Sequence, residues 1–473
     1  MSSRRAATTP QGGAQGGLAG RNGGHGGAAQ GSLVLTKAMF TSLRNKDFFF
    51  VWSSNLAAMF GMQMQMVARG WLIYDMTTSA LALAWVTLSF MAPTLAFSLI
   101  GGVIADRLRK KWVMLIGQAL HFLAILVLAT VTIQGDVTFT HFIFWGLFNG
   151  TVMALNSPAR QAIIPSLVGQ GELVNAVALS TASMNLSRIL APTMAGVLIA
   201  VVAGGDKTSF LGVGIVFYLI AFLDFVSIVL LLGLKDEGRD TRRERRSMGR
   251  DLADGLRYVR KTPVIGGLLV LGFVPLIFGM PVQFLLPVVN KDVLHMGPDG
   301  LGLLMTAMGA GALVGSLVLA GMGDMRRKGL ILLASSAAWA VFLGMFAVSE
   351  NLPLALVSLA LVGLASTAYM AMNMALVQLA VADEMRGRVM SLAMMTFGLM
   401  PLGVFPMSIV AERVGIGAAL LLGAAGLAIA SLVAAVAFPS IRRIDKGHAP
   451  ATAGDAAATQ PGVAPSPDVM AKT

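Results

Sequence analysis

The sequence predicts an all-α polytopic membrane protein with twelve transmembrane helices in two pseudo-symmetric six-helix bundles. Hydrophobic residues make up 56% of the 473 residues and charged residues only 12%, whereas a soluble domain is nearer half apolar and a quarter charged. About twelve apolar stretches are long enough to cross a bilayer, which takes roughly 20 residues in a helix. One charged segment divides them into six and six, and a short charged turn occurs in each half.

The N-terminal half begins after a tail rich in glycine, alanine and glutamine, residues 1–45. Such a composition cannot bury a core, so we expect this tail to be disordered. The predicted N-terminal bundle covers residues 46–234. Its six helices are expected at 48–74, 80–105, 112–133, 138–160, 173–203 and 209–234.

A cation-rich linker, residues 235–262, separates the two bundles. Within it, Leu252, Leu256 and Val259 share one helical face, which predicts a short amphipathic helix at the membrane interface. The predicted C-terminal bundle covers residues 263–440. Its six helices are expected near 263–290, 299–322, 329–349, 352–380, 388–412 and 416–438. Residues 441–473, rich in alanine and proline, are again expected to be disordered.

The net charge of +12 comes from cations that gather in the loops on one side of the predicted membrane. With the N-terminus inside, the cytoplasmic loops hold the linker cations and Arg107, Arg109, Lys110, Lys111, Arg160, Arg326, Arg327, Lys328, Arg386, Arg388, Arg442, Arg443 and Lys446. The opposite loops hold only Lys207, Lys291 and Arg413. Because loop cations set orientation, both termini are expected in the cytoplasm, with the chain in a bacterial cytoplasmic (inner) membrane. The positive charge therefore gives no reason to expect a nucleic-acid partner.

Several kinds of chemistry are excluded by residue content. The chain has no cysteine, which removes disulfides and thiolate sites, and its five histidines lack metal-ligand spacing. No Gly-Lys dipeptide occurs, so there is no P-loop for ATP. Asp75 and Asp324 are predicted on opposite membrane surfaces, too far apart for an aspartyl protease dyad. We therefore expect no enzyme activity, no catalytic residue, no metal and no cofactor.

The two charged turns share a pattern. The first is Gly102-Val-Ile-Ala-Asp106-Arg-Leu-Arg-Lys-Lys111 and the second, shorter copy occupies residues 321–329. Their aspartates, Asp106 and Asp324, are 324 − 106 = 218 residues apart, which indicates an internal duplication. The pattern resembles the loop 2–3 signature of the major facilitator superfamily, over roughly residues 46–440. Residues 157–165, 185–192, 255–260 and 386–391 resemble the subgroup that contains enterobactin exporters and macrolide-efflux proteins, the transmembrane secretion effectors.

The resemblance implies a conformational latch at these turns. A carboxylate at the inner end of one helix can accept from free N–H groups at the start of a helix in the other bundle. The latch residues would be Asp106, Arg107, Lys110, Asp324 and Arg327. The alternative is that these charges only set topology.

Three charges fall inside predicted helices, where charge is costly and usually functional. Arg188 and Asp224 lie equally far from Asp206 on adjacent antiparallel helices, which places them at the same depth. We predict that they pair, either as a proton-coupling site or as a buried ion pair that fixes packing. The third charge, Arg69, shares a helical face with Gln65.

Polar side chains in helices 1, 4, 7 and 10 are candidates for a substrate cavity, because the resemblance implies that helix 1 lines one. The alternative for Arg69 is that it snorkels to the outer interface. The candidate cavity residues are Gln65, Arg69, Asn149, Asn156, Gln283, Tyr369, Asn373 and Gln378.

The sequence thus favours a monomeric secondary transporter that alternates access between its two bundles. We expect proton-coupled efflux of amphipathic small molecules, drug-like or siderophore-like, with the small-molecule substrate, protons and the lipid bilayer as partners. The alternatives are a proton-coupled nutrient importer and a membrane scaffold or sensor without transport. Charged groups at mid-membrane depth favour a transporter, because a scaffold needs none.

Overall fold

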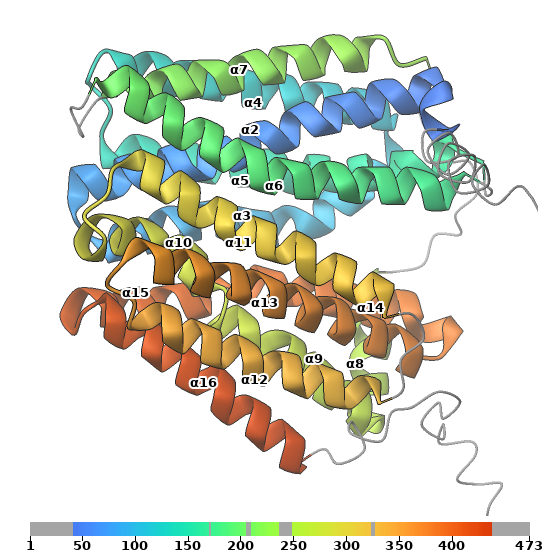
Figure 1. Ribbon diagram of the computed structural model, residues 1–473. Helices are drawn as coiled ribbons and strands as arrows, with labels where there is room; N and C mark the ends of the chain where they lie inside the picture. The colour runs from blue at the N-terminus through green and yellow to red at the C-terminus, as the bar shows by residue number, and fades with distance from the viewer. Residues whose placement is uncertain (1–40, 170–171, 205–209, 236–247, 323–326, 438–473) are drawn as a thin grey trace, which may run out of the picture.

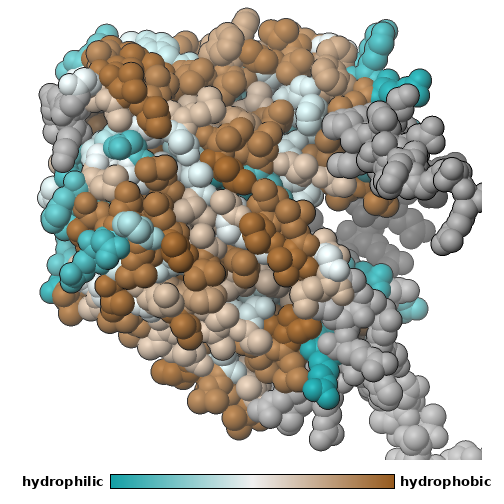
Figure 2. Space-filling view, viewed as in Figure 1, coloured by the Kyte–Doolittle hydropathy of each residue, from teal (hydrophilic) through white to brown (hydrophobic). Residues whose placement is uncertain are grey.

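The computed structural model describes residues 41–169, 172–204, 210–235, 248–322 and 327–437, and its long elements are helices that run side by side (Figure 1). Nine segments in these ranges are long and apolar enough to cross a bilayer. Three further segments, α2, α5 and α14 with α15, lie alongside them. Large apolar side chains cover the flank of the molecule in Figure 2, which is the surface that lipid chains would cover.

The first group of helices follows a short 3-10 turn, η1 (Thr41–Arg44). It consists of α2 (Lys46–Thr77), α3 (Ala80–Arg107), α4 (Lys110–Ile133), α5 (Phe139–Leu167), α6 (Leu173–Ala203) and α7 (Phe210–Leu232). The Asn45 side chain caps α2 by accepting from the N–H groups of Asp47 and Phe48, and Ser79 caps α3 in the same manner. Within the group, α3 packs on α5, α4 on α7, and α2 on both α6 and α7.

The second group begins with α9 (Pro263–Phe278), α10 (Pro281–Val288) and the π-helical turn η2 (Val289–Val293). It continues with α11 (Pro298–Gly321), α12 (Lys328–Ala347), α13 (Leu352–Ala380), α14 (Asp383–Thr396), the 3-10 turn η3 (Phe397–Leu399), α15 (Pro401–Arg413) and α16 (Ile416–Ala437). The helices predicted at 263–290 and 388–412 are both interrupted. Each break precedes a proline, Pro281 or Pro401, whose ring removes a backbone donor and disfavours a continuous helix.

The amphipathic linker helix α8 (Met248–Lys261) contacts α14 and α9 of the second group. Asp254 lies 3.6 Å from the Arg388 guanidinium of α14, and the Tyr258 hydroxyl accepts from the Ala382 N–H at 3.4 Å. Gly255 faces α14 with its backbone, while Leu256 is 47% exposed. The helix is therefore attached to the protein on one face and open on another.

The two groups contact each other mainly through α6 with α11 and α3 with α15. They lie close together at the end that holds the turn between α2 and α3, residues 78–79, at the left of Figure 1. They separate toward the end that holds α8, at the right. We refer to these as the α2–α3 end and the α8 end.

Close packing in the second group depends on small residues where α11 crosses α13. A Cβ on Gly311 would lie 1.8 Å from the carbonyl oxygen of Ala360, and one on Gly363 would lie 2.0 Å from that of Met308. Backbones this close exclude any side chain, as at many membrane helix crossings.

We expect Gly311→Ala to destabilise the folded protein by about 1–3 kcal/mol, because the added methyl group must push two helix backbones apart. Thermal unfolding of detergent-purified protein measures this as a lower Tm. Gly321→Ala is the matched control, since nothing lies within 4 Å of the Cβ position at Gly321. An unchanged Tm for Gly311→Ala would contradict the close crossing.

Candidate functional site

Polar contacts between the two groups close the α2–α3 end. The Lys291 ammonium of η2 lies 2.5 Å from the Asp75 carboxylate of α2, and the Tyr74 hydroxyl donates to Asp292. Where α3 meets α15, Glu412 of α15 accepts from the Ser79 hydroxyl at 2.8 Å and from a backbone N–H of α3 at 2.9 Å. The two groups are thus joined by charged and polar side chains at this end.

The contact between Tyr74 and Asp292 joins positions that are equivalent in the two halves. Their separation, 218 residues, equals that of Asp106 and Asp324. In a twofold arrangement, a position meets its own equivalent only near the axis. These two residues therefore mark the pseudo-twofold axis at the α2–α3 end. The π-helical turn η2 puts Lys291 and Asp292, which are neighbours in sequence, against the same helix.

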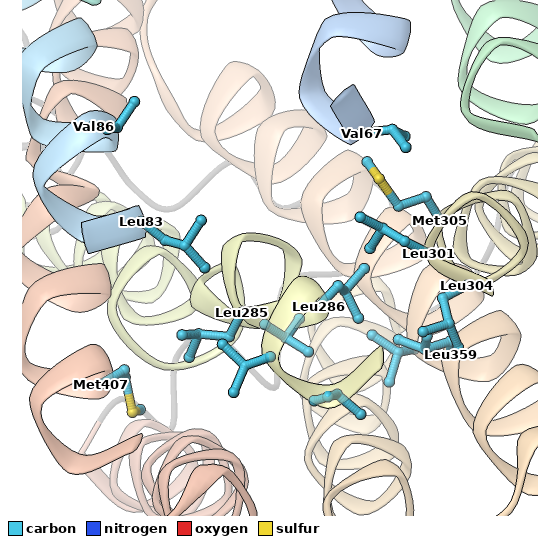
Figure 3. Close-up of a cluster of buried hydrophobic side chains, with 14 of the residues drawn as sticks. Val67, Leu83, Val86, Leu285, Leu286, Leu301, Leu304, Met305, Leu359 and Met407 are labelled. Atoms are coloured by element: carbon cyan, nitrogen blue, oxygen red, sulfur yellow. The ribbon is translucent and has the colours of Figure 1, made fainter. Parts of the chain in front are cut away.

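An apolar layer lies next to these polar contacts. Figure 3 shows side chains from α2, α3, α10 and α11 in one cluster, with Val67, Val86, Leu286 and Leu301 among them. Where α6 meets α11, the hydroxyls of Thr193 and Thr306 bond each other. This layer packs between the groups, so the α2–α3 end is closed by packing as well as by polar contacts.

Arg69 is half-buried beside this layer. Together with Gln283 and the surrounding apolar side chains it lines a small pocket with room for about one or two water molecules. Its guanidinium lies 5.7 Å from the ring centre of Trp145, a cation–π distance. Gln283 donates to the sulfur of Met66 at 3.2 Å, and the buried Gln65 amide nitrogen has no partner among the described residues.

Asp224 is the centre of a buried polar network inside the first group. Its carboxylate, 1% exposed, accepts from Gln118 Nε2 at 2.5 Å and lies 2.7 Å from His121 Nδ1. Arg160 donates to the oxygen of Gln118 and to Asn55. Four helices, α2, α4, α5 and α7, thus supply one connected set of groups that includes a carboxylate, an imidazole and a guanidinium. We call these residues the Asp224 network.

The prediction that Arg188 pairs with Asp224 is wrong. Both oxygens of Asp224 face α4, and Arg188 is exposed on α6 without an acidic partner among the described residues. Equal spacing from Asp206 predicts how far each residue lies along its helix, but it does not predict the direction in which the side chain faces. Placing Arg160 in a cytoplasmic loop is also wrong, because α5 continues to Leu167 and keeps Arg160 inside the bundle.

Two predicted cavity residues have a packing role. The Tyr369 hydroxyl donates to the Leu271 carbonyl at 2.6 Å, an oxygen that lacks its usual helix donor because position 275 is proline. The Asn373 amide donates to the Leu268 carbonyl at 3.0 Å. Both side chains are buried inside the second group, which corrects their assignment to the substrate cavity.

The other predicted polar residues are scattered. Asn156 is buried against Gly117 of α4, with its amide oxygen unpartnered among the described residues. Asn149 is half-buried on α5, and Gln378 is exposed near the α8 end of α13. None of these three joins the pocket that Arg69 lines.

The latch residues are described only in part. The side chain of Asp106 and the whole of Asp324 lie outside the described residues. Lys110 is 2% exposed, and Arg107 and Arg327 are exposed, with Arg327 at a left-handed φ of 61°. At this end the neighbouring Lys111 donates to the Leu232 and Leu234 carbonyls at 3.2 and 2.5 Å, which satisfies the C-terminus of α7.

Sequence reasoning missed several groups. Gln118 and His121 lie three residues apart on one face of α4. This spacing brings both side chains to the same neighbour, and it is the feature of the sequence that indicates a shared polar partner. Asp75, Lys291, Asp292 and Glu412 lie next to short loops, and nothing in their sequence neighbourhood indicates a partner in the other half.

Comparison with known proteins matches residues 37–456 to the family model described as transmembrane secretion effector. The enterobactin exporter EntS of Citrobacter koseri is 27% identical over 291 residues, which cover 62% of this chain and 67% of that protein. The enterobactin exporter EntS of Shigella boydii is 26% identical over 291 residues, which again cover 62% of this chain and 67% of that protein.

Solved structures share the fold. The nucleoside transporter NupG superposes with a TM-score of 0.64 at 16% identity, over 84% of this chain and 98% of that one. A D-xylose–proton symporter gives a TM-score of 0.63 at 13% identity, over 82% and 96%. An inward-facing bacterial homologue of the lysosomal transporter Spinster gives a TM-score of 0.64 at 12% identity, over 84% of this chain and 98% of that one. The prediction of the twelve-helix fold is confirmed.

Proposed function

Because this chain belongs to the transmembrane secretion effector family of major facilitator superfamily transporters, we propose that it exports an amphipathic small molecule from the cytoplasm by alternating access, driven by proton entry. The observation that carries the proposal is that the two bundles are sealed at the α2–α3 end and separate toward the α8 end. Alternation between closure at one end and closure at the other moves a bound molecule without opening a continuous pore.

The loop cations support the orientation in which the α8 end faces the cytoplasm. Both termini and the linker helix then lie on that side, in the cytoplasmic membrane of a bacterium. In this orientation the described conformer receives its substrate from the cytoplasm, as an exporter must.

The opposite conformer has to close the α8 end. We assign this to the latch residues of the two charged turns, Asp106 with Arg107 and Lys110, and Asp324 with Arg327. Each carboxylate would accept from the first N–H groups of a helix in the other bundle when that end closes. The latch and the contacts at the α2–α3 end would then form in alternation.

Proton coupling is assigned to the Asp224 network. A carboxylate 1% exposed and 2.7 Å from an imidazole is a site where gain or loss of one proton changes the charge of a buried cluster. Arg160 and Asn55 continue the network to α5 and α2. A change in its charge would therefore alter the packing of four helices at once.

Everted membrane vesicles that contain the protein should accumulate enterobactin or ethidium when their lumen is made acidic. An imposed difference of about one pH unit supports up to about tenfold accumulation per exchanged proton. Accumulation is measured by fluorescence or by chromatography of the vesicle contents.

Vesicles without the protein are the control, and a protonophore should remove the accumulation. Accumulation that persists after the proton gradient is collapsed would contradict proton coupling. A loss of preloaded compound from everted vesicles, driven by the acidic lumen, would contradict export.

A further inference from the structure

One face of α6 changes from buried to exposed along its length. Ala195 and Ile199 on this face are 0% and 1% exposed, near the α2–α3 end. In an α-helix, residues four or seven positions apart lie on the same face. Arg188, seven residues before Ala195, therefore lies on this face, but it is exposed. Further toward the α8 end, Val177 is 53% and Val174 80% exposed.

This exposed surface differs from the outward surface of the helix. Leu186, Leu190, Met194, Val197 and Val201 are 44–71% exposed on the opposite side of α6, where they form an apolar stripe of the kind that contacts lipid. Arg188 therefore faces the space between the two bundles.

The facing helix α11 shows the same change. Gly302 is buried and its Cβ position lies 2.6 Å from the Pro192 carbonyl oxygen, and the Cβ position at Gly309 lies 2.8 Å from that of Arg188. On the same side of α11 but nearer the α8 end, Leu317 is 62% exposed and Ala320 is exposed. Figure 1 shows α6 and α11 separating in this direction. Arg188 thus lies at the closed apex of an opening between the bundles.

No acidic side chain among the described residues pairs with Arg188. Asp224 is already bonded to Gln118 and His121, and Arg188 has no hydrogen bond or ion pair in the described part of the chain. Well inside the described helices there are three positive charges, on Arg69, Arg160 and Arg188, and one negative charge, on Asp224. The interior is therefore positive, which favours an anion in the opening.

We propose that the transported molecule is an amphipathic organic anion and that Arg188 binds its anionic group at the apex of this opening. The proposal rests on the transport function proposed above and specifies its substrate class. The guanidinium offers donors in a planar fork suited to a carboxylate, sulfonate or phosphate group. The apolar part of the ligand would lie against Val177 and Val174, which are nearer the α8 end of α6 than Arg188 is.

Charge pairing also gives a reason for coupling between binding and closure. Closing the α8 end around Arg188 removes water from a charge that has no ionic partner in the described part of the chain, which is strongly unfavourable. A bound anion supplies the missing partner. The loaded protein can then close where the empty protein resists closing.

The test uses two probes that share a fluorophore and differ in charge, anionic dansylglycine and cationic dansylcadaverine. Binding to the full-length protein in nanodiscs is measured by fluorescence anisotropy. We expect wild-type protein to bind dansylglycine at least about tenfold more tightly than dansylcadaverine, the size expected for one hydrogen-bonded charge pair. Arg188→Gln should lose this preference, Arg188→Glu should reverse it, and Arg188→Lys should retain most of it.

Arg260→Gln, at an exposed position on α8, is the matched control and should keep the wild-type preference. Size-exclusion profiles and Tm establish that each variant is folded, and retention of the preference by Arg188→Lys separates charge from packing. Equal affinities of wild-type protein for the two probes, or binding of neither, contradict the proposal, as does an unchanged preference in Arg188→Gln.

Failure of this proposal is distinguishable from failure of the transport function. If proton-driven vesicles accumulate dansylcadaverine but exclude dansylglycine, export stands and Arg188 is not an anion site. If the vesicles accumulate neither probe, nor enterobactin nor ethidium, while dansylglycine binds in an Arg188-dependent manner, the anion site stands and export fails.

Discussion

Asp224→Asn is expected to abolish proton-driven accumulation in everted vesicles, to the level of vesicles that lack the protein. Asparagine has the same shape and can still accept from Gln118, whose Nε2 lies 2.5 Å from the carboxylate. It cannot gain or lose a proton near neutral pH, so the cycle loses the step that couples proton entry to conformational change. Downhill exchange of substrate, measured as counterflow without a gradient, should persist.

The control for this variant is Asp136→Asn, which removes an exposed carboxylate in the connection between α4 and α5. His121→Gln should also lower proton-driven accumulation, because it removes the imidazole 2.7 Å from Asp224. Normal proton-driven accumulation by Asp224→Asn would rule out this network as the coupling site. Loss of counterflow together with coupled transport would indicate a packing role instead.

Lys291→Glu should open the α2–α3 end. The substitution places two carboxylates together where Asp75, 7% exposed at its side chain, now has a cation at 2.5 Å. Breaking a partly exposed pair of this kind costs about 1–3 kcal/mol, between the values for surface and buried pairs. The ratio of the two conformers should therefore shift by about 5- to 150-fold toward the state that is open at this end.

Single-cysteine labelling measures this shift without background, because the chain has no cysteine. Ala84 is 1% exposed in the apolar cluster between α3 and α15, so Ala84→Cys should resist a membrane-impermeant maleimide in wild-type background. Adding Lys291→Glu should make it reactive from the outside. The swapped pair, Asp75→Lys with Lys291→Glu, should restore protection, and equal labelling in all three backgrounds would contradict the closure.

The sequence was sufficient to predict the helices, their number and the division into two groups, because length and hydropathy determine which segments can cross a bilayer. It did not predict their rotation. The helices are apolar on nearly every side, so no hydrophobic stripe shows which way Arg188 or Asp224 faces. Equal spacing from Asp206 predicts only how far each residue lies along its helix, and in the structure Arg188 faces the opening while Asp224 faces Gln118.

The position at which a helix ends was also not predicted correctly for α5. A predicted helix end at residue 160 places Arg160 at a loop, although α5 continues to Leu167. Only the fold shows that this guanidinium bonds Asn55 and Gln118. Polar partners from distant helices, such as Asp75 with Lys291, cannot be paired from sequence without knowing which positions meet at the axis.

The meeting of Tyr74 with Asp292 bears on how such a molecule can arise. In a chain formed by duplication, a position on the symmetry axis at first faces an identical copy of itself, and two like carboxylates there would repel each other. An acid and its hydroxyl donor become possible only after one copy has mutated. The hydrogen bond between Tyr74 and Asp292 therefore had to be acquired after the two ancestral copies became free to change separately.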